Sequence, residues 1–472
     1  MANTASSFRR FRPSLPLVLL AVFLLALWVA GGASRADATG QIVVRGMGFV
    51  CLIAMILFGD RPVFASARPV WLLLAGALAL AVIQLIPLPP SLWQALPGRA
   101  PFAEAAAASG QAQPWRPWSI VPGATVNAAT ALVVPIVMLV LVTGLRQAER
   151  AWLPALLLGF VVASTLFGLL QFSGAGVNNL FVNDTTGVMS GPFANRNHFA
   201  LLLALGCLLV PVWVLGDGRR ARWRGPVGLG LLLLFALAIL GTGSRAGMVL
   251  GGLALIVAAV LGWDGLRREL RHAPRWVLPT LVAFVALLFV TLVLISVAAD
   301  RAVAIQRSFA IDVEQDMRGR ALPTVLAMVR HYFPFGSGLG GFDPMFRMAE
   351  PFDLLKPTYF NHAHNDFVEI VLDAGLPGLL VLLAGLGWWG WASIVAWRGG
   401  LARGSMERRG SERSALARLG SAMLLLVILA SAFDYPARTP IVMAIAVIAA
   451  VWLNDRGPPF TASALPRSDR HL

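Results

Sequence analysis

Blocks of about 17–23 apolar residues recur along this chain, separated by short links that carry arginine. About 20 apolar residues are what a helix needs to cross the ~30 Å hydrocarbon core of a bilayer. Lipid offers the backbone no hydrogen bonds, so helices are the spanning element that fits such blocks, whereas strands would need the alternating pattern of a barrel. Only 13% of the residues are charged, against roughly a quarter in soluble domains. The chain is therefore predicted to be an all-α polytopic membrane protein.

The hydrophobic pattern predicts about twelve transmembrane helices. Their approximate ranges are 15–32, 42–58, 69–88, 126–143, 151–172, 196–215, 226–242, 246–262, 276–298, 376–397, 419–434 and 440–453. We expect three parts: residues 1–298 with the first nine helices and short loops, a large loop at 299–375, and residues 376–472 with three helices and a tail. The large loop is predicted to be periplasmic and to carry short amphipathic helices and the active site. Segment 89–125, which contains Trp115 and Trp118, is either a re-entrant or surface segment or a wet loop.

The net charge of +15 follows the topology and does not indicate a nucleic-acid partner. With both termini in the cytoplasm, the inside links and termini hold 24 of the 38 basic residues and the short outside links hold seven. The positive-inside rule expects this bias. The first span could instead be a cleaved signal peptide ending near Ala36-Asp37-Ala38, but its apolar stretch exceeds the usual length. Cys51 and Cys207 lie inside predicted spans, so no disulfide framework is expected.

The large loop contains two local patterns. Apolar residues at helical spacing predict an amphipathic helix on the outer membrane surface; these residues are Leu322, Val325, Leu326, Val329 and Phe333. The glycine run that follows, residues 336–341, matches G-x-G-x-x-G by letters, but no strand precedes it and no helix opens at it. It is interpreted as a tight turn, one whose backbone N–H groups could face an anion.

Residues 361–367, Asn-His-Ala-His-Asn-Asp-Phe, precede the tenth predicted span and allow three interpretations. His362, His364 and Asp366 suggest a metal site, but the further ligands that zinc requires are not visible. One histidine could act as a general base, with Asp366 or Glu369 holding its ring. Alternatively Asn365 or Asp366 caps the following helix and the histidines are merely interfacial. The base and cap interpretations both stay open.

Arginines on the outer side form a second constellation. Arg245 follows Gly241-Thr242-Gly243-Ser244 at an outer turn, where the positive-inside rule disfavours it. Its companions on that side are Arg196, Arg318, Arg320, Arg330 and Arg438. Guanidinium forks bind phosphate oxygens in pairs, so these arginines predict an anionic, membrane-tethered ligand such as a lipid diphosphate. Snorkelling to lipid headgroups is the alternative. The hairpin at 434–440 serves either structure or ligand binding.

Taken together, these residues resemble the O-antigen ligase and polymerase superfamily of bacterial membrane glycosyltransferases. The resemblance covers roughly 200–440 and rests on four stretches. They are Ser244-Arg245-Ala246-Gly247; Arg320 with the later Pro334-Phe335-Gly336-Ser337-Gly338-Leu339-Gly340-Gly341-Phe342; His362-Ala363-His364-Asn365-Asp366-Phe367 with Gly375-Leu376-Pro377-Gly378; and Asp434-Tyr435-Pro436.

The resemblance implies transfer of a glycan from undecaprenyl diphosphate to an acceptor hydroxyl at the periplasmic face of the bacterial inner membrane. The acceptor is the lipid A core in ligases, another lipid-linked glycan in polymerases, and a protein in O-oligosaccharyltransferases. It implies His364 as the base, with His362 the weaker candidate and Asn361, Asn365 and Asp366 in support. It also implies arginines on the diphosphate: Arg245 and Arg320, with Arg318, Arg196 and Arg438 as further candidates.

The chemistry of the residues is consistent with this activity. Breaking the anomeric carbon–oxygen bond leaves negative charge on the departing diphosphate, and arginines stabilise that charge electrostatically. We therefore expect catalysis without a metal or another cofactor, and inversion at the anomeric carbon because a single displacement inverts. A transporter or lipid-linked glycan flippase is the rival class. Transporters place ionisable residues near the bilayer midplane, whereas here they gather in the loop and at outer helix ends.

Overall fold

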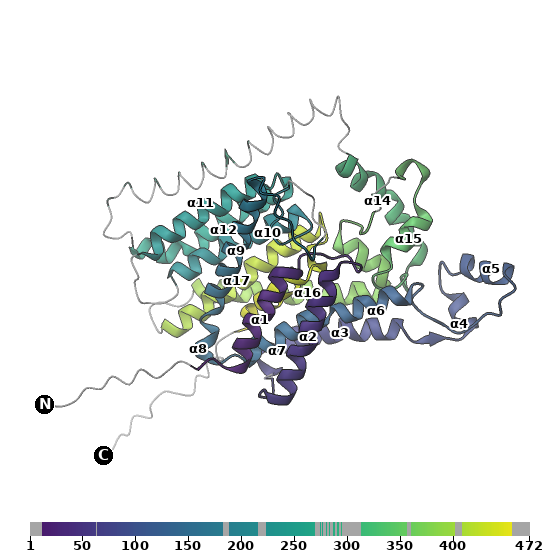
Figure 1. The fold of residues 1–472 in the computed structure, drawn as a ribbon. Coiled ribbons are helices and arrows are strands. Elements are labelled where there is room, and N and C mark those ends of the chain that lie inside the picture. The colour runs from purple at the N-terminus through teal and green to yellow at the C-terminus, as the bar shows by residue number, and fades with distance from the viewer. Residues whose placement is uncertain are drawn as a thin grey trace, which may run out of the picture.

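The computed structural model describes residues 12–62, 64–182, 188–215, 223–269, 313–355, 360–401 and 408–455, with single positions between 274 and 294. Most of this part of the chain is helical, and its strands are limited to an antiparallel ribbon of two residues in each strand, β1 (Pro87–Leu88) and β2 (Arg116–Pro117). Figure 1 shows the long helices gathered in one bundle, with the short helices α4 and α5 extending from one end.

The bundle is built from the longer helices of the chain and two short ones. They are α1 (Leu15–Ala30), α2 (Thr39–Phe58), α3 (Arg68–Gln84), α6 (Pro122–Ala131), α7 (Val133–Gly144), α8 (Gln147–Arg150), α9 (Leu153–Phe172), α10 (Arg196–Leu215), α11 (Arg224–Gly241), α12 (Arg245–Glu269), α16 (Asp366–Leu401), α17 (Arg408–Ser431) and α18 (Pro440–Asn454). The remaining elements are η1 (Phe64–Ala67), α4 (Pro90–Ala95), α5 (Ala100–Ala108), α14 (Val313–Tyr332), α15 (Phe342–Ala349), η3 (Phe352–Leu354) and η4 (Pro436–Arg438).

Eight described segments are long and apolar enough to cross a membrane, with α6 continuing into α7 and α8 into α9. The helices α1, α3 and α18 are shorter and apolar. Together they coincide with every predicted span except 276–298, most of which lies outside the described residues. Other predicted segments also lie outside the described residues: 299–312 and 356–359 of the predicted loop, and the predicted cytoplasmic segments 1–11 and 456–472. The predicted all-α polytopic fold is confirmed, and the chain is a multi-pass membrane protein.

The tenth predicted span begins earlier than its hydropathy indicates. α16 starts at Asp366 instead of near residue 376, and Gly375 interrupts it with φ 58° and ψ −143°. The turns before Gly375 contain Glu369 and Asp373, which are both fully buried. A hydropathy average excludes such turns because it counts their ionisable residues as unfavourable. It takes no account of groups elsewhere in the chain that compensate their charge.

The predicted amphipathic helix at 322–333 is present as the second half of α14, but its apolar residues divide between two faces. Val325 is buried in a cluster with Phe342 and Phe346 of α15. Leu322 and Leu326 are about 40% exposed, at 41% and 40%. α14 therefore uses one apolar face to pack on α15 and keeps a second one exposed, and its placement on a membrane surface stays a prediction.

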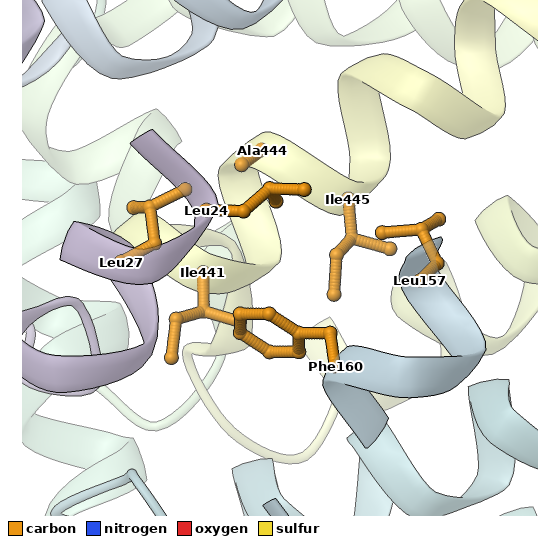
Figure 2. Close-up of a pocket in the computed structure, with 7 residues that line it drawn as sticks. All are labelled: Leu24, Leu27, Leu157, Phe160, Ile441, Ala444 and Ile445. Carbon is orange, nitrogen blue, oxygen red and sulfur yellow. The ribbon is translucent and has the colours of Figure 1, made fainter. Parts of the chain in front are cut away.

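The first and last helices pack together and fix the elements that precede α18. The N–H of Ile441 donates to the carbonyl of Gly31 at the end of α1, with N and O 3.2 Å apart. Figure 2 shows side chains of α1, α9 and α18 pointing toward one another: Leu24, Leu27, Leu157, Phe160, Ile441, Ala444 and Ile445. This apolar packing holds the start of α18, and therefore the hairpin before it, in a defined place.

Segment 89–125 is a folded unit built from α4, α5 and strand β2, which pairs with β1 just before the segment. Its Arg99 is fully buried and donates to the carbonyl oxygens of Trp118 at 2.8 Å and Gly336 at 3.0 Å. The guanidinium also lies over the ring of Tyr332, 5.9 Å from its centroid. Burial lowers the pKa of Arg99 to about 10, so the side chain remains charged near neutral pH. Arg99 thus attaches this segment to the glycine run.

The glycine run 336–341 is a tight turn, as predicted, with φ of 79°, 115° and 76° at Gly336, Gly338 and Gly340. Gly338 donates its N–H to the carbonyl oxygen of Asp373 at 2.8 Å. Gly340 donates to the Asp373 carboxylate at 3.1 Å. The group that faces this turn is therefore the side chain of Asp373 on α16, and the turn fastens the loop to that helix.

Replacing Gly375 by alanine is expected to destabilise the protein by at least about 1–3 kcal/mol. A Cβ at this position would lie 2.0 Å from the carbonyl oxygen of Pro334, and φ is +58°. Thermal unfolding of the purified protein in detergent measures the effect. Gly387→Ala on the same helix is the control, since nothing lies within 4 Å of its Cβ position; it should be neutral or stabilising by about 0.5–1 kcal/mol. Equal melting temperatures for the two variants would contradict the packing described here.

Candidate active site

The carboxylate of Asp434 lies at the centre of a hydrogen-bonded cluster between α17 and η4. Its Oδ1 is 3.1 Å from Nδ1 of His364. Its Oδ2 accepts from the side-chain amides of Asn195 at 3.0 Å and Asn197 at 2.8 Å. Nη2 of Arg318 approaches the same oxygen at 3.8 Å. Asp434 is buried, and a buried carboxylate is tolerated only when its charge is compensated in this way.

A second acid holds the other histidine of the His-x-His pair. Nδ1 of His362 lies 2.9 Å from Oε1 of Glu369, whose other oxygen accepts the N–H of Ala363 at 2.8 Å. A carboxylate beside Nδ1 favours the tautomer that carries the proton there, which leaves Nε2 as an acceptor. Within the described part of the chain, Nε2 of His362 and of His364 has no hydrogen-bond partner. Both histidines thus have the arrangement of an oriented base.

Tyr435 separates the two pairs and contacts a third histidine. Its ring centroid lies 4.4 Å from that of His362, 4.9 Å from that of His364 and 5.1 Å from that of His198. The side-chain amides of Asn361 and Asn195 lie beside its hydroxyl. The tyrosine therefore fixes the spacing of the rings around it.

His198, in the first turn of α10, completes the group. Both of its ring nitrogens are buried without a hydrogen-bond partner among the described residues. Its Nε2 lies 3.9 Å from Oδ1 of Asp434, beyond hydrogen-bonding distance. Its position places a further proton acceptor next to the carboxylate that orients His364.

Arg438 of η4 connects this cluster to α16. Its Nε lies 3.0 Å from Oδ1 of Asp366, and its Nη1 lies 3.1 Å from Oε1 of Glu369 and 3.9 Å from Oδ2 of Asp373. Asp366 also accepts the hydroxyl of Ser431 at 2.9 Å. One guanidinium thus faces three buried carboxylates of one helix. The arrangement compensates their charge and ties the hairpin before α18 to the start of α16.

Asn365 caps α16, so the base and cap interpretations of this stretch are compatible. Its Oδ1 accepts the N–H groups of Phe367 and Val368, both at 3.1 Å, and its Nδ2 donates to the carbonyl of Ala432 at 3.0 Å. The residue before it, His364, has φ +50°, and no other non-glycine residue in the described chain has a positive φ. Such backbone outliers gather at functional sites, where the surroundings enforce them.

The arginines predicted from the sequence occupy different surroundings. Arg318 lies at the Asp434 cluster and also approaches the carbonyl of Phe433 at 3.4 Å. Arg320 points to Asp353, 2.8 Å away, in a pair that is 41% and 70% exposed. Arg245 is half-buried and follows Ser244, whose hydroxyl donates to Asn197 at 2.7 Å. Arg196 is exposed, and its Nη1 would lie 3.6 Å from a Cβ at Gly243.

Burial and hydrogen bonding act in opposite directions on the His364–Asp434 pair. Burial lowers the pKa of His364 below its ordinary value, and the Asp434 carboxylate offsets part of that effect. Burial alone would raise the pKa of Asp434, but the hydrogen bond with His364 and the neighbouring positive groups hold it well below its usual range. The pair is therefore an ionised carboxylate beside a neutral imidazole near pH 7.

The sequence identified both histidines and offered Glu369 as a partner, which holds His362 in the structure, but it did not identify Asp434 as the partner of His364. Asp434, Asn195 and Asn197 lie far from residue 364 in the chain. Asp434 was indicated by the polar 434–440 hairpin and by the resemblance, but neither assigned it to His364. His198 carried no periodic or spacing signal. Within the part of the chain that the structure describes, no three His, Cys, Asp or Glu side chains are grouped as metal ligands, and metal-free catalysis stays a prediction.

The fold and this cluster define a multi-pass membrane protein whose acid–histidine pairs lie beside arginines at one end of a helix bundle. Residues 229–383 match the family described as O-antigen ligase, which supports membership of the O-antigen ligase superfamily. A comparison with curated proteins finds no match. The family match supports a membrane glycosyltransferase activity of the ligase or polymerase type, with lipid-linked glycan and glycan acceptor substrates in general. The matched segment contains Arg245, Arg318, His362 and His364, whereas Asp434 lies outside it.

Replacing Arg438 by methionine is expected to destabilise the protein by about 3–5 kcal/mol, because it leaves buried carboxylates without their cation. Thermal unfolding in detergent measures the loss. Arg347→Met is the matched control: Arg347 pairs with Asp343 on the surface, with side chains 53% and 32% exposed. Removing such a pair changes stability by at most about 1 kcal/mol. Similar losses for the two variants would show that Arg438 is not the stabilising centre argued here.

Proposed function

We propose that this protein is an O-antigen ligase-like enzyme that transfers a glycan from undecaprenyl diphosphate to an acceptor hydroxyl. The lipid A core, or another surface glycan, is the proposed acceptor. The observation that carries the proposal is the His364–Asp434 pair, whose Nδ1–Oδ1 distance is 3.1 Å and whose histidine has φ +50°. The geometry is that of an imidazole oriented through Nδ1 so that Nε2 can take a proton.

In the proposed reaction, Nε2 of His364 takes the proton of the acceptor hydroxyl. At the same time the oxygen of that hydroxyl bonds to the anomeric carbon of the donor. The bond between that carbon and the diphosphate oxygen breaks, and its electron pair leaves with undecaprenyl diphosphate. Asp434 stabilises the imidazolium that forms. A single displacement of this kind inverts the anomeric configuration. His362, oriented by Glu369 and separated from His364 by Tyr435, is the second choice for the base.

Arg318 is the first choice among the arginines for the departing diphosphate. It lies 3.8 Å from the carboxylate that orients the base, and its side chain is 29% exposed, so a ligand can reach it. Arg245 and Arg196 lie at the neighbouring turn and are proposed to share the charge. Arg320 pairs with Asp353 away from the acid–histidine pairs, and Arg438 is engaged by acids of α16, so both are proposed to support the site indirectly. Guanidinium groups supply the required positive charge, which is why no metal is proposed.

The packing of the connecting segments supports a site on the periplasmic face of the inner membrane, with both termini cytoplasmic. Links predicted to lie outside contact one another, as residues 195–198, 361–366 and 434–438 do at the acid–histidine pairs. Links predicted to lie inside also contact one another, because Glu149 accepts the N–H and hydroxyl of Ser14 at 2.8 and 2.6 Å. Figure 1 shows α8, which contains Glu149, far from α14 and α15. The loop 299–375 is accordingly proposed as the part of the chain that carries the catalytic histidines.

The experiment that tests the proposal is reconstitution of the purified protein with an undecaprenyl-diphosphate glycan. Core lipid A, a second lipid-linked glycan and a peptide are offered as acceptors. Replacing His364 by alanine should reduce transfer roughly 10²–10⁴-fold, the contribution of a general base. Asp434→Asn and Arg318→Gln should each reduce it strongly, while Arg320→Gln should reduce it less. His362→Ala is the matched test of the second histidine.

The acceptor that is used identifies the branch: the core for a ligase, the lipid-linked glycan for a polymerase, and the peptide for a protein O-oligosaccharyltransferase. Donor binding that depends on Arg318, without transfer to any acceptor, would favour a lipid-linked glycan flippase instead. Loss of activity in chelator with recovery on added Mg²⁺ or Mn²⁺ would contradict the metal-free reaction. Retained anomeric configuration in the product would contradict the single displacement.

The rate should depend on pH through His364, which must be neutral to accept a proton. Because the pKa of His364 is lowered, kcat/KM should fall only at pH values below the ordinary histidine pKa of about 6.5. Asp434 raises that pKa, so Asp434→Asn should move the acidic limb to still lower pH while reducing the maximal rate. Full pH profiles of both proteins measure this. An unchanged limb, or one displaced to higher pH, would exclude Asp434 as the partner of the titrating group.

A further inference from the structure

A cavity of about 410 Å³ lies beside the acid–histidine pairs. Its wall is formed by the α1–α2 connection, the first turns of α2, α6, the end of the glycine turn and the start of α18. The polar side chains that face it include Arg35, Arg45, Asn127, Asn361, His362 and Arg438. Its volume is that of a small-molecule site, about 300–1,000 Å³. His362 lines this cavity, whereas His364, Arg318, Arg245 and Arg196 do not.

Arg45 is the one arginine of this cavity whose charge no carboxylate of the described residues compensates. Its Nη1 donates to Asn127 Oδ1 at 2.7 Å and to Thr130 Oγ1 at 2.9 Å, and its Nη2 donates to Gln41 Oε1 at 3.1 Å. Its Nε is buried without a hydrogen-bond partner. All of its partners are neutral. By contrast, Arg35 pairs with Asp37, and Arg438 pairs with Asp366 and Glu369.

The position of Arg45 makes the lack of a carboxylate beside it, among the described residues, informative. It belongs to α2, a candidate membrane span, and α6 holds its guanidinium through Asn127 and Thr130. A charged side chain within a span is costly unless it faces a water-filled cavity or a ligand, and it marks a functional site by default. The acids at the cavity wall do not supply the counter-ion, since Asp343 pairs with Arg347 and Asp37 with Arg35.

We infer that this cavity binds an anionic sugar of the acceptor, with Arg45 on its phosphate or carboxylate group. Asn127 and Asn361 supply amides for hydroxyl groups, and the His362–Glu369 pair lies at the wall nearest His364, since Tyr435 contacts both histidine rings. The inference rests on the proposed function for the direction of transfer. The donor diphosphate is assigned to Arg318, Arg245 and Arg196, none of which lines the cavity, so the cavity is left to the acceptor.

Direct binding to the full-length His364→Ala protein in nanodiscs tests the inference without requiring transfer. The probes are a phosphorylated core oligosaccharide, the same oligosaccharide after removal of its phosphates, and undecaprenyl diphosphate. Adding Arg45→Gln should weaken binding of the phosphorylated oligosaccharide by about tenfold or more, the effect of losing a charge-assisted hydrogen bond. Arg45→Lys should retain part of it. Binding of undecaprenyl diphosphate should not change.

Asn127→Asp is a second variant that does not remove the arginine. It puts a carboxylate of the same shape 2.7 Å from Nη1 of Arg45, so it should compete with the ligand anion while preserving or raising the melting temperature. Weakened oligosaccharide binding in a fully folded Asn127→Asp protein is the expected result. In the transfer assay of the otherwise native enzyme, Arg45→Gln should raise the acceptor KM by about tenfold and leave the donor KM unchanged.

Three outcomes would overturn the inference: failure of the parent protein to bind the phosphorylated oligosaccharide, equal binding of the phosphorylated and dephosphorylated forms, or a loss in Arg45→Gln confined to undecaprenyl diphosphate. A loss confined to undecaprenyl diphosphate would assign the donor diphosphate to this cavity. Absence of transfer to every acceptor, with Arg45-dependent oligosaccharide binding retained, would instead count against the proposed function and leave the anion site standing.

Discussion

The ion pairs of Arg438 with the acids of α16 are the interaction on which the site depends. Arg438 contacts Asp366 and Glu369 at 3.0 and 3.1 Å. Glu369 in turn holds His362, and Asp434, on the same hairpin as Arg438, holds His364. Desolvating these charges is unfavourable unless every partner is in place. The same contacts therefore tie the last two helices to α16 and set the orientation of both histidine rings.

The amino-acid sequence was sufficient to predict the membrane fold because the bilayer imposes one strong rule. A span must be apolar over about 20 residues and must bond its own backbone, so hydropathy alone locates most helices. Hydropathy did not predict the start of α16, because Glu369 and Asp373 are ionisable residues that are nevertheless buried within the protein. Hydropathy did not predict how segment 89–125 folds either. Its anchor, Arg99, bonds carbonyl oxygens of Trp118 and Gly336, and a contact between residues so far apart leaves no periodic signal.

Within the site, the sequence indicated both histidines and one group that positions them, Glu369, but missed Asp434 as the partner of His364. His362 and His364 stand out because two histidines beside amides and acids are unusual at the start of a span. Asp434, by contrast, is one acid in a short turn, and its importance comes from the 70 residues of chain that fold back to place it 3.1 Å from His364. Arg318 and Arg320 are alike in sequence, two positions apart on α14. Only the direction of each side chain, toward Asp434 or toward Asp353, distinguishes them.

The boundary of the family match divides the residues of the site. Residues 229–383 include His362, His364 and Arg318, which under the proposed function act on the donor and the transferred proton. Arg45 and Asn127 of the cavity lie in the unmatched first half. Donor chemistry is the same whenever a polyprenyl diphosphate leaves, whereas acceptors differ between ligases, polymerases and protein transferases. Under the proposed function, the choice of acceptor therefore rests on both parts of the chain: Arg45 and Asn127 come from the unmatched first half, and Asn361 and His362 come from the matched segment.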